Sequence, residues 1–231
     1  MASQNKSQNN FMLGVRDSYP VCIAFLFMCI SFGGLAKTVG LSLMQTMSMA
    51  MMIYSIPLQI FLISLAKSNL VLSTIVMLTF VINARFFLMS LSLVHRFKGV
   101  SLTKTIPALL ILSASSFTVA HVKFLNEDIE RPFNYYVGVA LSAYVMTFFS
   151  TLAGFYIAFI NDSVILYHVF SIALAIHFTA LTAIRFPNIR LIVATIFGFA
   201  MLPLLSPIVT LNINILISPF VVATIMLLTR K

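Results

Sequence analysis

Long apolar runs alternate with short polar interruptions along the whole chain. A helix that crosses the hydrocarbon core of a bilayer needs about 20 apolar residues, and eight runs approach that length. The pattern therefore predicts an all-α, polytopic transmembrane helical bundle of about seven or eight spans, some of them short or broken. The predicted spans are residues 19–36, 42–66, 70–94, 105–123, 134–160, 164–184, 190–208 and 212–229.

Two polar stretches interrupt this pattern most clearly. The first 16 residues, MASQNKSQNNFMLGVR, are expected to be frayed, because they contain few residues that would pack into a core. The longest internal polar stretch is residues 123–134, which hold three of the five acidic residues. We therefore expect a polar N-terminal segment over residues 1–18 and a single transmembrane domain over residues 19–231.

Composition supports a membrane protein. The 231 residues are 61% hydrophobic and 8% charged, and the mean hydropathy is +1.07. A soluble domain carries about a quarter charged residues, so there is too little polar surface here for a soluble particle. The net charge of +9 does not indicate nucleic-acid binding, because the basic residues mostly flank apolar runs, where they orient the chain and meet anionic lipid headgroups.

The distribution of Lys and Arg predicts the orientation of the chain. With eight spans, nine of these residues fall on the side that holds both termini and four on the other side. The excess favours termini in the cytoplasm. The cluster Arg96, Lys98 and Lys104 falls on the opposite side and argues against this orientation.

Arg85 is the only ionisable residue between residues 69 and 94. An arginine near the centre of a spanning helix costs about 2.5–3.5 kcal/mol on insertion scales, so we expect it to face protein or a wet cavity. Helical spacing puts Asn83 and Ser90 on one face and Arg85 and Ser92 nearly opposite. All five acids lie outside the apolar runs, which leaves a backbone carbonyl, a carboxylate of another subunit or a substrate carboxylate as its partner.

The second apolar run contains Pro57, which is expected to break a helix interior by clashing with the carbonyl of Ile53. Broken helices with freed carbonyls form the binding sites of many transporters. Gln59, two residues later, is positioned to hydrogen-bond a polar ligand. A proline kink without any ligand is the alternative, because such kinks are common in membrane helices.

The same run is rich in methionine, and Met44, Met47 and Met51 are predicted to share one face. Thioethers bind copper(I), but methionine is also a common gap filler and no Cys or His lies nearby, so packing is favoured. Cys22 and Cys29 are interpreted as core residues. We expect no metal site and no cofactor.

His168 and His177 are nine residues apart, so they face opposite sides of one predicted span and cannot bind one metal ion. They are the candidates for a proton carrier if transport is proton-linked, because no apolar run contains an acid. A hydrogen-bonded helix contact is the favoured alternative for each. The chain shows no catalytic constellation, so no catalytic residue and no enzyme activity are predicted.

The segment INARFFLMSLSLVHRF, residues 82–97, contains an N-x-R motif, an S-x-S pair and a basic loop. It resembles the signature of the AzlC family of branched-chain amino acid permeases, and with two further segments the resemblance covers about residues 19–208. This segment is the most specific of the three. The other two are residues 31–61, which contain a stretch that ends at Gln59, and residues 138–154. The matching positions are Asn83, Arg85, Ser90, Ser92, Gly33, Gly40, Leu41, Ser42, Gln59, Gly138, Thr151 and Gly154.

This resemblance implies a secondary transporter that exports branched-chain amino acids, and in some members methionine, across the bacterial inner (cytoplasmic) membrane. Such permeases work with a small AzlD-type membrane subunit, and the sequence leaves a homo-oligomer open. The expected substrate-binding residues are Arg85, Asn83, Gln59, Pro57 and Ser90, with the arginine on the substrate carboxylate.

The chain departs from the family pattern in its fourth segment. Members commonly have an acidic pair before a phenylalanine, whereas this chain has Ala114 and Ser115 before Phe117. The loss motivates one alternative, an accessory membrane subunit without transport activity, in which Arg85 docks a partner. A second alternative is a permease of changed substrate, such as a metal ion bound by the methionine face.

Overall fold

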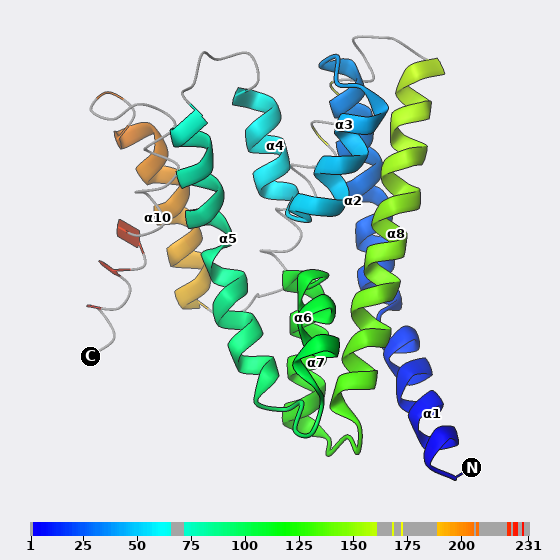
Figure 1. The fold of residues 1–231 in the computed structure, drawn as a ribbon. Helices are drawn as coiled ribbons and strands as arrows, with labels where there is room; N and C mark the ends of the chain where they lie inside the picture. Colours follow the sequence, from blue (N-terminus) through cyan, green and yellow to red (C-terminus); the bar gives the residue numbers. More distant parts are fainter. Residues whose placement is uncertain are drawn as a thin grey trace. The chain divides into compact units, whose positions relative to one another are not determined.

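The computed structural model describes residues 2–65, 72–160 and 189–205, and isolated positions between residues 168 and 228. Every element in these ranges is helical, as predicted (Figure 1). The chain forms two compact units, Met1–Leu174 and Ala175–Lys231. The described part of the second unit is chiefly helix α10 (Ile189–Leu205), which contains Pro203 near its end. The remaining helices belong to the first unit.

Helices α2 (Tyr19–Thr38) and α8 (Pro132–Ile160) form the centre of the first unit. They are the two described helices that are long and apolar enough to cross a membrane. A Cβ atom on Gly33 would collide with the carbonyl oxygen of Thr151, and a Cβ atom on Gly154 with that of Ile30. The two glycines therefore allow the backbones of α2 and α8 to pack in direct contact, as small residues do between membrane helices.

The N-terminal segment is not frayed, contrary to expectation. It forms helix α1 (Ala2–Asp17), which packs along α8. Gly14 meets the backbone of Tyr135, and Gly138 meets that of Phe11, so neither position has room for a side chain. The apolar stretch FMLGV at residues 11–15 explains the difference, because it gives an otherwise polar segment a surface to bury.

The predicted span 42–66 is a hairpin, so the prediction of one crossing helix is wrong. It consists of α3 (Leu43–Ser48), the π-helix η1 (Met49–Ile53) and α4 (Ile56–Leu65), and α4 runs back in the direction opposite to α3, in contact with η1 and α2 (Figure 1). Ile63, near the end of α4, packs against Phe32 and Ala36, near the end of α2. Both ends of the hairpin therefore lie at the same end of the unit.

The predicted span 105–123 is also a hairpin. Helix α6 (Leu102–Leu110) and helix α7 (Ala114–Asn126) run in opposite directions and are separated by residues 111–113. The loops before α6 and after α7 lie side by side, because residues 96–100 and residues 130–134 line one pocket. This hairpin enters from the end of the unit opposite to the first one, so the two tips face each other (Figure 1).

Helix α5 (Leu72–Val94) confirms the predicted helix over residues 70–94, and α2, α8 and α10 confirm three others. One face of α5 packs through Phe86, Met89 and Leu93 against the core of the second hairpin. The predicted spans 164–184 and 212–229 lie outside the described ranges. The count of seven or eight spans is therefore not confirmed.

Candidate functional site

The tips of the two hairpins meet against α8. Tyr54, at the tip of the first hairpin, has a left-handed backbone (φ 45°, ψ 36°), a conformation that costs about 1–3 kcal/mol for a residue other than glycine. Its hydroxyl lies close to the side chains of Thr147 on α8 and Ser113 at the start of α7. Its ring makes edge contacts with Phe25 and Tyr144, at centroid distances of 6.4 and 5.1 Å. Tyr54 therefore forms the turn of the first hairpin and also contacts Ser113, at the turn of the second hairpin.

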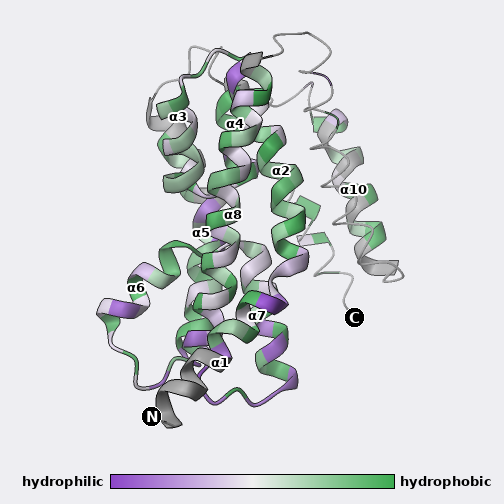
Figure 2. Cartoon of the chain, turned by 90° about the vertical axis from the view of Figure 1, so that its right-hand side faces the viewer, coloured by the Kyte–Doolittle hydropathy of each residue, from purple (hydrophilic) through white to green (hydrophobic). Residues whose placement is uncertain are grey.

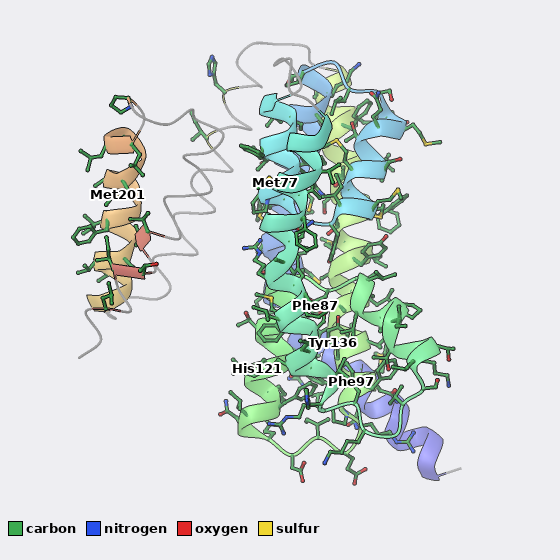
Figure 3. All side chains as sticks on the ribbon, turned by 60° about the vertical axis from the view of Figure 1, so that its left-hand side comes forward. Met77, Phe87, Phe97, His121, Tyr136 and Met201 are labelled. Carbon is green, nitrogen blue, oxygen red and sulfur yellow. The ribbon has the colours of Figure 1, made fainter. Side chains whose placement is uncertain are left out.

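Helix α8 supplies hydrogen bonds to the carbonyl ends of both broken segments. The Tyr144 hydroxyl donates to the carbonyl of Met51 in η1 at 3.2 Å, and the Tyr136 hydroxyl donates to that of Ala108 in α6 at 3.0 Å. The two tyrosines are eight residues apart, so they share one face of α8 and lie about 12 Å apart along its axis. Figure 3 shows Tyr136 beside Phe97, whose ring lies 5.4 Å away.

The amino end of α7 is capped within its own first turn. Ser113 accepts a hydrogen bond from the Ser116 amide at 3.1 Å, and the Ser116 hydroxyl accepts one from the Ser113 amide at 2.9 Å. This capping box leaves the amides of Ala114 and Ser115 without a hydrogen-bond partner in the described ranges. Neither residue is acidic and both are half-buried. The end of the helix therefore carries two unused donors and its positive dipole.

Several hydroxyl groups around the tips are buried without a hydrogen-bond partner. Among the residues that the structure describes, those of Tyr54, Ser55 and Thr151 have none, although the residues are only 8%, 3% and 0% exposed. Other helical hydroxyls, such as those of Ser31 and Thr46, bond a carbonyl one turn earlier. An unpaired buried hydroxyl costs about 1–3 kcal/mol in proteins. The hydroxyls of Tyr54 and Ser55, at the tip of the first hairpin, are therefore candidates for contact with a ligand.

Pro57 does not cause the break. It lies in the first turn of α4, where a proline disturbs no helical hydrogen bond, and the chain turns before it at Tyr54 and Ser55. The predicted clash with the carbonyl of Ile53 is therefore wrong. Gln59 lies one turn from the tip, is 1% exposed, and its side-chain amide donates to the carbonyl of Met49 at 3.0 Å.

The structure divides the predicted polar residues of α5 between two sides. The amide oxygen of Asn83 is buried without a partner, and Ser90 is half-buried on the side that packs on the second hairpin. Arg85 and Ser92 are exposed, and the Arg85 guanidinium lies 5.0 Å from the centroid of the Phe86 ring. A substrate role for any of them stays a prediction.

The methionines that were predicted to share one face of the first hairpin differ in their surroundings. Met51, in the π-helix, packs against a buried cluster that includes Phe32 and Ala50. Met44 is 78% exposed. In the described ranges, no three His, Cys, Asp or Glu residues come together to hold a metal ion. His168 is exposed at an isolated described position, and His177 lies outside them.

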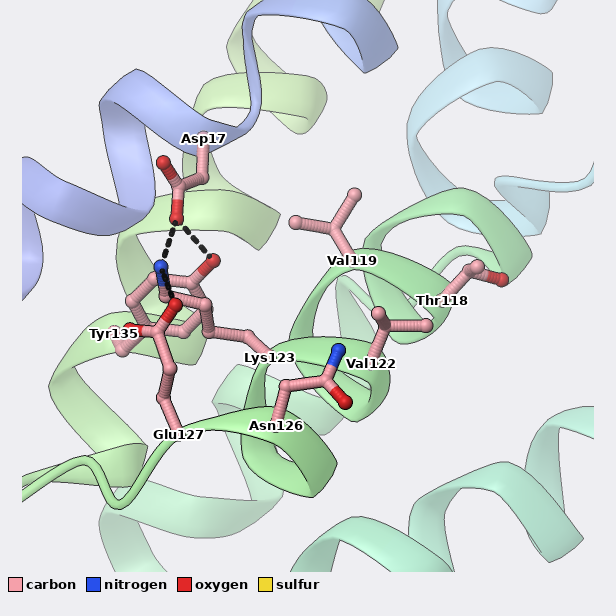
Figure 4. Close-up of a pocket in the computed structure, with 8 residues that line it drawn as sticks. All are labelled: Asp17, Thr118, Val119, Val122, Lys123, Asn126, Glu127 and Tyr135. Carbon is pink, nitrogen blue, oxygen red and sulfur yellow. Dashed lines mark hydrogen bonds and ion pairs between the residues drawn. The ribbon is translucent and has the colours of Figure 1, made fainter.

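An ionic cluster joins α1, α7 and α8 at one end of the unit (Figure 4). The Lys123 ammonium lies 2.8 Å from Glu127 and 3.3 Å from Asp17, which also accepts a 2.8 Å hydrogen bond from Tyr135. These groups border an open pocket of about 340 Å³. The hydrogen bond with Glu127, followed by that with Asp17, raises the pKa of Lys123, so Lys123 is charged at neutral pH and loses its proton only as the pH rises through this raised value.

The sequence interpretation missed Tyr54, Ser113, Tyr136 and Tyr144. A partial signal was present, because a buried tyrosine hydroxyl needs a hydrogen-bond partner, and two tyrosines eight residues apart share a helix face. The sequence S-x-x-S at residues 113–116 was a second signal for a helix start.

Comparison with protein families gives a match over residues 20–160, a segment that contains both hairpins and the three helices α2, α5 and α8. The matching family is described as AzlC protein. Comparison with curated proteins gave no match, and comparison with solved structures gave none. The matched segment is more than half of the chain, and it includes each of the motifs that resembled this family. The chain therefore belongs to the AzlC family, a family of branched-chain amino acid transporter components.

Proposed function

We propose that this chain is the permease of a secondary transporter that exports branched-chain or other apolar amino acids across the bacterial inner membrane. The observation that carries the proposal is the meeting of two hairpin tips around buried, unpaired polar groups. Transporters commonly bind substrate between broken helices, whose free backbone groups take the place of water. The apolar residues around the tips suit an aliphatic side chain.

The hairpins also support an orientation. Arg16, Arg96, Lys98, Lys123 and Arg131 all belong to the end of the unit at which α1 begins (Figure 1). Figure 2 shows hydrophilic residues gathered at the same end, around the connections beside α7. The eight-span assignment had placed Arg96 and Lys98 on the opposite side. Under the positive-inside rule, this end is cytoplasmic.

Arg85 supports a second membrane subunit as partner. It lies among exposed apolar residues of α5 such as Met77 and Phe87, which are 65% and 66% exposed (Figure 3). A carboxylate is one group that offsets the insertion cost of an arginine in an apolar helix. We assign that carboxylate to a small AzlD-type subunit, because Arg85 is exposed on α5 and is accessible to a partner.

A non-transporting accessory subunit is the second candidate function. The observation in its favour is the first turn of α7, which holds no acidic residue. The permeases that the chain resembles commonly have an acidic pair at these positions. If those acids carry protons or position substrate, their absence removes that step. The chain would then bind its partner through Arg85 without moving an amino acid.

Amino-acid efflux distinguishes the two functions. Cells that lack their own exporters are loaded with dipeptides of leucine, isoleucine, valine or methionine, and efflux is measured with this chain, with and without the small subunit. We expect efflux of at least one of the four that depends on the partner and is lost in Arg85→Leu. A folded, partner-bound chain that releases none of them supports the accessory function.

Two possible roles of Arg85, docking of the small subunit and contact with the substrate carboxylate, are distinguished in the same cells. If Arg85 docks the partner, Arg85→Leu abolishes co-purification of the small subunit, and Arg85→Lys retains part of it because the charge is kept. If Arg85 contacts the substrate carboxylate instead, Arg85→Leu blocks efflux while the complex stays intact.

A further inference from the structure

The amino end of α7 has the properties of an anion site. The helix has 13 residues, so its aligned peptide dipoles place about half a positive charge at this end. The amides of Ala114 and Ser115 point out of the helix end without a partner in the part of the chain that the structure describes. Backbone amides at a helix end bind carboxylates and phosphates in many proteins.

A second, independent observation points to a ligand at the same place. Tyr54 is only 8% exposed, and its hydroxyl lies close to the side chains of Thr147 and Ser113, the N-cap of α7, but meets the geometry of a hydrogen bond with no residue in the described ranges. A phenol hydroxyl is a good donor to an anion. Ring contacts with Phe25 and Tyr144 hold this side chain in place. The site therefore has a third fixed donor, from the other hairpin.

The negative ends of the neighbouring helices do not oppose an anion here. The carbonyls of Met49 and Met51 in η1 are bonded by Gln59 and Tyr144, and that of Ala108 in α6 is bonded by Tyr136. These donors offset part of the carbonyl dipole at both breaks. The described acidic residues all lie far along the chain from the tips, at the end of the unit where α7 finishes: Asp17, Glu127, Asp128 and Glu130.

We propose that the amides of Ala114 and Ser115, together with the Tyr54 hydroxyl, bind the carboxylate of the transported amino acid. The inference rests on the proposed function, which it deepens by naming the residues that hold the substrate. It assigns the carboxylate to the meeting point of the two hairpins, so Arg85 is not the substrate ligand.

Replacement of Ser115 tests the site without removing the helix. An aspartate in the first turn favours a helix through the dipole, so Ser115→Asp is expected to fold, but its charge repels a carboxylate. The proposed site is therefore particular to this chain, whose first turn of α7 has no acidic residue where the permeases that it resembles commonly have a pair. Purified protein in nanodiscs, with the small subunit where folding requires it, is assayed for binding of radiolabelled leucine, isoleucine, valine and methionine. We expect Ser115→Asp to weaken binding at least tenfold, and more strongly than the neutral, similarly sized Ser115→Asn, which adds no charge.

Tyr54→Phe removes the third donor and leaves the ring contacts in place. Loss of one hydrogen bond to a charged group is expected to weaken binding by about tenfold. The matched control is Tyr156→Phe, an exposed tyrosine on α8. Equal binding by the parent chain, Ser115→Asp and Tyr54→Phe would overturn the site.

A carboxylate probe separates failure of the site from failure of the proposed function. The thermal stability of the parent chain is measured with 4-methylpentanoate and with its uncharged amide. Stabilisation by the acid alone, absent in Ser115→Asp, supports the anion site even if none of the four amino acids binds, a result that would contradict the proposed function. Equal effects of acid and amide, or an unchanged effect in Ser115→Asp, would refute the anion site even if leucine binds.

Discussion

At the scale of single residues, polar side chains on apolar helices stabilise the two places where a helix is interrupted. Tyr136 and Tyr144 look like ordinary core residues in the sequence, yet each bonds a carbonyl that a broken segment leaves free. Tyr54 adopts a left-handed backbone that no glycine or asparagine signals. The sequence therefore indicated the region of the break through Pro57 and Gln59, but not its position or the residues that stabilise it.

The first prediction concerns Tyr136. Tyr136→Phe leaves the buried carbonyl of Ala108 without its hydrogen bond, which is expected to destabilise the protein by about 1–3 kcal/mol. For a chain of this size, that corresponds to a fall in Tm of roughly 2–4 °C for each kcal/mol. Thermal unfolding of the purified protein measures it, and Tyr156→Phe serves as an exposed control on the same helix. An unchanged Tm in Tyr136→Phe would contradict a structural role for this bond.

At the scale of elements, hydropathy predicted the straight helices and failed at the hairpins. An apolar run of 20–25 residues has the length of one crossing helix, and two half-length helices folded back on each other have the same composition. The helices over residues 19–36, 70–94 and 134–160 were predicted because no break interrupts them. The runs 42–66 and 105–123 were misread, because their turns use Tyr54 and Ser113 rather than a Gly-rich signal.

The second prediction concerns the contact between α2 and α8. Gly33→Val places a side chain against the backbone of Thr151, and overpacking of this kind costs about 1–3 kcal/mol or prevents assembly. We expect loss of the monodisperse peak in size-exclusion chromatography of the detergent-solubilised protein. Gly198→Val is the matched control, because a Cβ at Gly198 on α10 meets no atom within 4 Å. A well-folded Gly33→Val protein would show that the helices are not in direct backbone contact.

At the scale of the whole molecule, two hairpins that enter from opposite ends account for a charge pattern that continuous spans could not. The basic cluster at residues 96–104 conflicts with the orientation in an eight-span arrangement. The same cluster agrees with a cytoplasmic N-terminus once residues 42–66 fold back instead of crossing. For the described part of the first unit, the two local breaks and the positive-inside rule together support the proposed orientation, with the end that carries this cluster in the cytoplasm.

The third prediction tests this orientation in cells. In a background without Cys22 and Cys29, we introduce Lys98→Cys and Asp128→Cys at one end and Met44→Cys at the other, all at exposed positions. A membrane-impermeant thiol reagent is expected to label only Met44→Cys in intact cells, and all three after permeabilisation. Labelling of Lys98→Cys in intact cells would place the basic cluster outside and refute the orientation.

The meeting of the two hairpin tips at the transport site is tested most directly by joining them. In the same cysteine-free background, Tyr54→Cys and Ser113→Cys are combined and treated with a short bifunctional methanethiosulfonate reagent, whose reach compensates for the lost tyrosine ring. Because Tyr54→Cys also removes a proposed substrate ligand, efflux is compared before and after cross-linking of the same double variant, and each single variant serves as a control. The account predicts that only the double variant forms the cross-link, that its residual amino-acid efflux then falls at least tenfold, and that a reducing agent restores it. Failure to cross-link, or unchanged efflux with the tips joined, would contradict the account.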